Sequence, residues 1–173
     1  MTVFSVSALA FGAAQQQKAP GRPPKARALT TMDYIEIQQL GRKFMWALDG
    51  GDNFGYAYAD LFAPGGVFTD TTDGPNGKTT QGRDNLALLP RGGQRGPLFL
   101  NHFGMNHVIT PTADGAKGKV YVAILDLAQR PHSVTHGGFY DDVYEKTAVG
   151  WRFKSRAFHE SKVDIWPQPP ASR

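Results

Sequence analysis

The spacing of hydrophobic residues divides the chain into a helical N-terminal part and a C-terminal part made of strands. From residue 31, apolar residues recur every three or four positions, which places them on one face of a helix. These residues are Ile37, Leu40, Phe44, Ala47 and Leu48. Thr30 and Asp33 have the spacing of a helix start, and Gly50-Gly51 predicts the end of this long helix.

Shorter elements follow the long helix. We expect a second helix over residues 52–62 with Asp52 as its N-cap, a turn over 63–66, a strand over 67–70, a loop or hairpin over 71–80, and a third helix over 83–89. The pattern then changes to long strands, expected over 98–111, 119–128, 137–147 and 151–162. Helices followed by a strand meander are typical of an α+β fold.

The first of these long strands contains two histidines, His102 and His107. Side chains alternate between the two faces of a regular strand. Because the two histidines are five positions apart, we expect their imidazoles on opposite faces, with Asn106 on the face of His102. At most one histidine can then line an interior pocket, and we expect His107 to be structural or exposed.

Composition restricts the classes of protein and site. The chain has 173 residues, 40% of them hydrophobic and 12% aromatic, which fits one domain with a real core. It lacks cysteine, a phosphate-binding glycine loop, and any compact histidine–carboxylate spacing, so we expect neither a cofactor nor a metal. The net charge of +4 comes from the N-terminal arm, which argues against nucleic-acid binding. No stretch is long and apolar enough to span a membrane.

The termini differ from the centre of the chain. Residues 2–14 are apolar and rich in small residues, like the core of a secretory signal, although no basic residue precedes them. One interpretation is that this segment is a truncated signal, which predicts a periplasmic or secreted protein. The alternative is that it is the flexible terminus of a cytoplasmic protein. Residues 1–30 thus form a signal segment and a linker rich in proline and basic residues, 31–165 the domain, and 166–173 a disordered tail.

Several motifs occur in an order that resembles a known family. They are ALDGGD, YADLFAPGGVF, GRDNL, HFGMNHVI, GGFYDDVYEK and GWRFKSR, within residues 32–161. This set resembles the SnoaL-like branch of the nuclear-transport-factor-2-like superfamily. The resemblance implies a cone: a curved antiparallel sheet wrapped around a long N-terminal helix, with a deep pocket at its open end. Relatives include scytalone dehydratase, hexachlorocyclohexane dehydrochlorinase and proteins that only bind ligands or other proteins.

The resemblance also implies a catalytic pair. The run from His102 to Asn106 is similar to a histidine motif of the dehydrochlorinase, in which an aspartate matching Asp49 orients the histidine base. A carboxylate on one ring nitrogen fixes the tautomer of a histidine and supports its protonated form. The alternative is that Asp49 is an ordinary polar residue at a helix end and His102 a core histidine. The active-site arginine of the dehydrochlorinase has no clear equivalent in this sequence.

Other residues are candidates for contact with a substrate. Tyr56, Phe68, Asn106 and Tyr140 are expected to bind it, although core packing explains the aromatic ones equally well. Trp46, Phe62, Phe139 and Trp151 are most simply core residues, although any of them could line the pocket. Tyr140, Asp142 and Tyr144 share one face of a strand; one of them could be a second polar group of the pocket, but such a face more commonly points to solvent or another subunit.

These observations predict a cofactor-free lyase or isomerase. In this hypothesis His102 removes a proton from carbon in a small, mostly apolar, cyclic molecule, and Asp49 orients the imidazole. The alternative is a non-catalytic module of the same fold that binds a small molecule or a protein. The resemblance further implies a homo-oligomer, a dimer or trimer, formed through the outer face of the sheet.

Overall fold

The computed structural model describes residues 26–72, 74, 76–90, 100–128 and 130–161. The signal-like segment and the C-terminal tail discussed above lie outside these residues. The helical elements are α1 (Thr31–Gly50), the short 3-10 helix η1 (Asn53–Gly55), α2 (Tyr56–Ala59) and α3 (Arg83–Ala87). The strands are β1 (Phe62–Asp70), β2 (Lys78–Gln81), β3 (Leu100–Pro111), β4 (Ala116–Asp126), β5 (Ser133–Thr147) and β6 (Gly150–Glu160).

Helix α1 begins and ends where the sequence predicts. The Asp33 backbone N–H donates to the Thr30 hydroxyl at 3.2 Å, and the Thr30 N–H donates to the Asp33 carboxylate at 2.9 Å. These reciprocal bonds satisfy two N–H groups that a helix start leaves without partners. Gly51 ends the helix in a left-handed conformation with φ of 63°.

The start of α1 is also joined to the sheet through Asp33. Its second carboxylate oxygen accepts hydrogen bonds from Lys146 at 2.6 Å and from the Trp151 indole at 2.9 Å. The Lys146 hydrogen bond is the largest cause holding the Asp33 pKa well below its usual range. A single carboxylate thus caps the helix and fixes it to β5 and β6.

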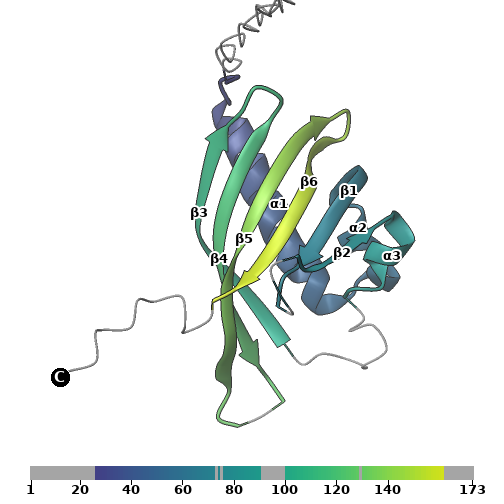
Figure 1. Ribbon diagram of the computed structural model, residues 1–173, viewed down its shortest axis with the longest axis vertical. Helices are drawn as coiled ribbons and strands as arrows, with labels where there is room; N and C mark the ends of the chain where they lie inside the picture. Colours follow the sequence, from purple (N-terminus) through teal and green to yellow (C-terminus); the bar gives the residue numbers. More distant parts are fainter. Residues whose placement is uncertain (1–25, 73, 75, 91–99, 129, 162–173) are drawn as a thin grey trace, which may run out of the picture.

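The sheet is curved, and α1 lies along its concave side (Figure 1). The strand order is β2-β1-β6-β5-β4-β3. Strands β3 to β6 form the expected antiparallel meander, and β2 pairs with β1 in an antiparallel hairpin. The α+β cone is therefore confirmed, but β1 pairs in parallel with β6, so the sheet is mixed rather than wholly antiparallel.

Two sequence predictions between α1 and β1 are wrong. Residues 63–66 do not form a turn but belong to β1, because the irregularity at Gly65, with φ of 78°, is absorbed as a register shift against β6. The second helix is shorter than expected, because Phe54 has a left-handed conformation with φ of 57°. The Asp52 side chain forms no capping hydrogen bond.

The core centres on Phe44, which has no solvent exposure. Its ring contacts Tyr58, Tyr140 and Phe153, with ring centroids 4.8, 5.5 and 5.6 Å away. Phe62 and Trp151 are buried as expected, whereas Trp46 is 79% exposed. The prediction for Trp46 is wrong because its position on α1 lies beside the apolar stripe rather than within it.

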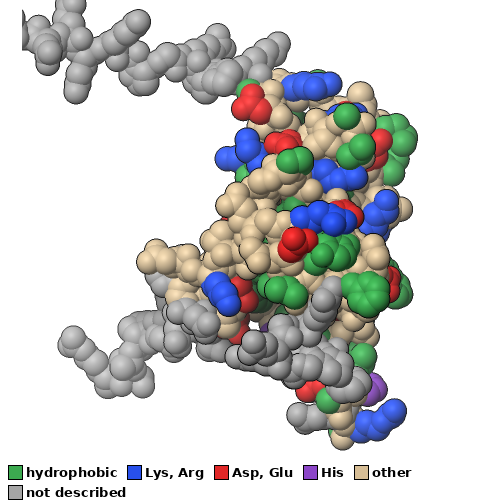
Figure 2. Space-filling view, turned by 90° about the vertical axis from the view of Figure 1, so that its right-hand side faces the viewer, with side chains coloured by type: hydrophobic (Ala, Val, Ile, Leu, Met, Phe, Trp, Pro, Cys, Tyr) green, Lys and Arg blue, Asp and Glu red, His purple; other side chains and the backbone are tan. Residues whose placement is uncertain are grey.

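No helix among the described residues is long and apolar enough to cross a membrane. On the face drawn in Figure 2, cationic and anionic side chains are interspersed, and neither sign gathers into a continuous patch.

Candidate active site

A β-bulge in β3 brings both histidines to the same face of the sheet. Met105 pairs with Tyr121 and Val108 with Lys119, so Asn106 and His107 together oppose Val120. Asn106 takes up the extra residue in a left-handed conformation with φ of 54°. The expectation that His102 and His107 point in opposite directions is therefore wrong.

Asp49 and His102 meet at the end of α1. The Asp49 Oδ1 lies 2.5 Å from His102 Nδ1, and Asp49 Oδ2 accepts the His102 backbone N–H at 2.9 Å. Both carboxylate oxygens are thus held by one residue of β3. The last turn of a helix disfavours negative charge, and these two hydrogen bonds offset that cost.

The geometry assigns roles to the two ring nitrogens of His102. The Asp49 carboxylate accepts a hydrogen bond from the N–H group at Nδ1. In the neutral imidazole this leaves the lone pair on Nε2. Among the described residues, no hydrogen bond occupies Nε2. The side chains of His102 and Asp49 are 10% and 14% exposed, so the pair is largely shielded from water. This arrangement is suited to taking a proton at Nε2.

A second polar cluster lies on the inner face of β5 and β6. Arg156 donates two hydrogen bonds of 2.8 Å to Asp142, and both side chains have no solvent exposure. The guanidinium also packs on the rings of Phe44, Tyr140 and Phe153, at 4.1, 4.2 and 4.3 Å from their centroids. Burial opposes the charge of Arg156, but Asp142 more than offsets it and raises the arginine pKa.

His107 is connected to this cluster through Tyr144. The Tyr144 hydroxyl donates to Asp142 at 2.5 Å and lies 3.0 Å from His107 Nε2. Because the hydroxyl hydrogen is used by Asp142, His107 Nε2 is the donor to Tyr144. Burial is the main cause that lowers the pKa of His107. Burial is also the largest cause that raises the pKa of Tyr144, and the Asp142 charge is the second largest. The expectation that Tyr140, Asp142 and Tyr144 face solvent or a subunit is wrong, since all three are at least 97% buried.

Two buried polar atoms have no hydrogen-bond partner among the described residues: the Tyr58 hydroxyl and one terminal nitrogen of Arg156. Each such atom forgoes a hydrogen bond that water would have supplied. Both side chains pack against Phe44.

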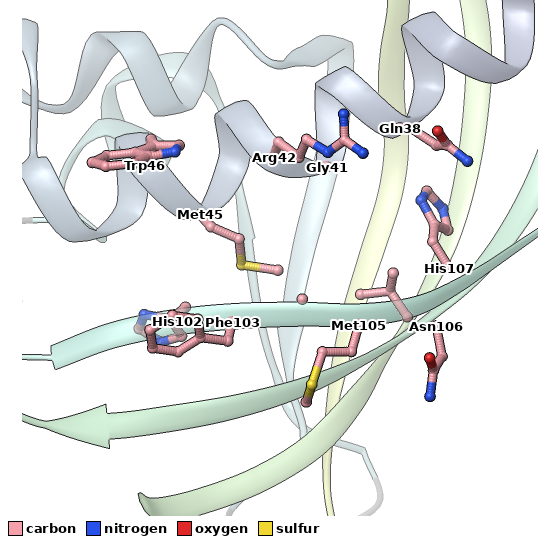
Figure 3. Close-up of a pocket in the computed structure, with 12 residues that line it drawn as sticks. Gln38, Gly41, Arg42, Met45, Trp46, His102, Phe103, Met105, Asn106 and His107 are labelled. Carbon is pink, nitrogen blue, oxygen red and sulfur yellow. The ribbon is translucent and has the colours of Figure 1, made fainter.

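The four predicted substrate-binding residues lie in different places. Tyr140 is buried, and its pKa is raised mainly by burial, with smaller contributions from the charges of Asp142 and then Asp49. Phe68 packs against the core beside Phe44. Tyr56 lies apart from the pair and donates to Asp84 at 3.0 Å. Asn106 does not share the face of His102, because the bulge turns its side chain away from α1 (Figure 3).

Sequence reasoning missed the buried cluster of Arg156 and Asp142. Alternation places Arg156 on the same strand face as Phe158, and Asp142 on that of Tyr140, but it does not show that these faces are buried against each other. No group of three metal-ligating side chains is found among the residues that the structure describes.

A family model for the SnoaL-like domain matches residues 30–157, which is most of the chain. The chain belongs to the SnoaL-like family. A search of curated proteins found no match for this SnoaL-like protein.

Solved structures resemble this SnoaL-like protein across most of their own length. A Nostoc punctiforme protein of unknown function with a cystatin-like fold is 20% identical with a TM-score of 0.65, covering 79% of this chain and 97% of that one. A Catenulispora acidiphila protein in complex with S-DNPA is 25% identical, with a TM-score of 0.62 and coverages of 76% and 95%. A candidate scytalone dehydratase from Novosphingobium aromaticivorans is 19% identical, with a TM-score of 0.57 and coverages of 76% and 85%.

Proposed function

We propose that this SnoaL-like protein is a cofactor-free lyase or isomerase that acts on a small, mostly apolar, cyclic molecule. The observation that carries the proposal is the largely buried hydrogen bond of 2.5 Å between Asp49 and His102. The aspartate fixes the imidazole with its unprotonated nitrogen free, as a base for a C–H group requires.

In the proposed reaction, His102 Nε2 takes a proton from a carbon beside a carbonyl group. The C–H electrons move into a new C=C bond of an enolate, while Asp49 stabilises the positive imidazolium. The enolate then re-forms its C=O bond while a new C=C bond expels the hydroxyl group of the neighbouring carbon with its bonding electrons. This hydroxyl takes the proton from His102 and leaves as water, which gives a lyase and restores the base. If His102 instead returns the proton to another carbon, the net reaction is an isomerisation.

The test uses a panel of cyclic β-hydroxy ketones, whose dehydration to conjugated enones is followed by ultraviolet absorbance. We expect His102→Ala and Asp49→Asn each to lower kcat by about 10²- to 10⁴-fold, the usual contribution of a general base. His159→Gln is the matched control, because this histidine pairs with Asp141 away from the Asp49–His102 pair. Circular dichroism confirms that each variant is folded.

If both variants retain the wild-type rate, the pair is not catalytic. If the wild-type protein binds these compounds without converting any of them, the alternative of a non-catalytic binding module replaces the proposal.

We also propose that copies of the chain associate through the outer face of the sheet. Phe103, Met105, Val108 and Tyr121 are each between 46% and 63% exposed on strands β3 and β4. Exposed apolar side chains that are adjacent on paired strands are typical of an interface.

A further inference from the structure

A groove of about 390 Å³ runs between α1 and the edge strand β3 (Figure 3). His102 and Trp46 lie toward one end, and His107 rises from β3 toward Gln38 at the other. Arg42 lies on the helix side between these ends. The groove therefore connects the proposed base to a second set of polar side chains on the same two elements.

The lining of the groove is chemically one-sided. Met45 and Trp46 contribute apolar surface from α1, and no aspartate or glutamate is among the twelve lining residues. Among the lining residues, Arg42 is the one lysine or arginine. Within the part of the chain that the structure describes, Arg42 forms neither an ion pair nor a side-chain hydrogen bond.

Two other polar side chains, Gln38 and His107, lie at this end of the groove. Burial is the main cause that lowers the pKa of His107; the Asp142 charge raises this pKa, and the charges of Arg156 and Arg42 lower it. Gln38 lies on α1 one turn before Arg42, and its side-chain amide supplies further hydrogen-bond donors. A guanidinium and an amide on the helix, facing a wall without carboxylates, are complementary to an anion that has two oxygen atoms.

We propose that the groove binds an aromatic or alicyclic carboxylic acid. Arg42 and Gln38 hold the carboxylate, and the ring lies over Met45 and Trp46 with its edge toward His102. The inference deepens the proposed function, because it assigns an acidic group to the substrate, but the binding of the acid itself does not depend on turnover.

The experiment measures binding of 2-naphthylacetate and of its neutral counterpart, 2-naphthylacetamide, by isothermal titration calorimetry on the full chain. We expect the carboxylate to bind about tenfold more tightly than the amide, as a charge-assisted hydrogen bond would give. Arg42→Gln should remove this preference. Lys43→Gln, an exposed cation on the same helix that does not line the groove, should retain it.

The exposed Trp46 provides a second readout, because its fluorescence should change when a ring covers it; Trp46→Phe should remove that change. The proposal is overturned if neither probe binds, if acid and amide bind equally, or if Arg42→Gln and Lys43→Gln have the same effect. Asp49→Asn separates this proposal from the proposed function, because Asp49 does not line the groove. Carboxylate binding should persist within about threefold in this variant whose turnover is lost, and loss of carboxylate binding in the folded variant overturns the groove assignment.

Discussion

Asp142 and Arg156 exchange two hydrogen bonds of 2.8 Å in a place without solvent exposure. Removing one partner of such a pair leaves a buried charge without compensation. We expect Asp142→Asn to lower the free energy of unfolding by about 3–5 kcal/mol, measured by urea denaturation.

The double variant Asp142→Leu with Arg156→Met is the matched comparison. It removes both charges, so it should be less destabilised than Asp142→Asn alone. An equal or larger loss in the double variant would contradict the view that the uncompensated charge is the main cost.

His107 predicts a pH dependence of stability. Burial lowers its pKa from the usual value of 6.5, and the charges of Arg156 and Arg42 act in the same direction, whereas Asp142 opposes them. The unfolded chain therefore binds this proton more readily, so the stability is complete above about pH 6.5 and decreases as the pH falls through the lowered pKa.

His107→Gln retains a hydrogen-bond donor for Tyr144 but removes the titrating group. We expect this variant to lose less unfolding free energy than the wild type between about pH 7.5 and about pH 5, values that lie on either side of the usual histidine pKa. Urea denaturation at both pH values measures the difference. Equal losses in the two proteins would show that other groups account for the acid sensitivity.

The contact between Asp49 and His102 could be predicted because the sequence resembles a known family, whereas the burial of Arg156 was not predicted. The resemblance implied this contact from a short histidine motif and an aspartate at a helix end, and hydrogen bonds join the two residues. Arginine is seldom fully buried, so a single sequence offers little reason to place Arg156 inside. Only the pairing of β5 with β6 shows that Asp142 lies opposite it.

At the scale of elements, the bulge in β3 decides which side chains face α1. Asn106 has φ of 54°, a conformation that asparagine and glycine adopt more readily than β-branched residues. We expect Asn106→Val to cost about 1–2 kcal/mol and Asn106→Gly to be tolerated, as measured by urea denaturation. Thr110→Val, at an exposed position of the same strand, is the control. Similar values for the two valine variants would contradict this account.

Element types were largely predictable from periodicity, but their irregularities were not. Helix α1 and the four strands of the meander fall close to their expected ranges, because their patterns are long and regular. The bulge at Asn106 and the register shift near Gly65 depend on pairing with distant strands. A rule of strict alternation therefore placed His107 on the wrong face.

At the scale of the whole molecule, the exposed apolar side chains on the outer face predict self-association. We expect size-exclusion chromatography with light scattering to give a mass at least twice the 18.9 kDa of one chain. Changing Val108→Glu and Tyr121→Lys together should produce the monomer, because charged side chains disfavour a buried apolar contact. Val149→Lys, at an exposed valine that follows β5, should leave the mass unchanged. A monomeric wild-type protein would contradict the proposal.

The parallel contact between β1 and β6 has a consequence for the order of folding. Phe68 pairs with Arg156, and all of β3, β4 and β5 lies between them in the chain. During synthesis, the β1–β2 hairpin leaves the ribosome long before its other neighbour exists, and contacts of such large sequence separation form slowly. The nascent hairpin therefore exposes one open edge until the last strand has been made, and an unpaired edge of this kind is a site at which chains can associate.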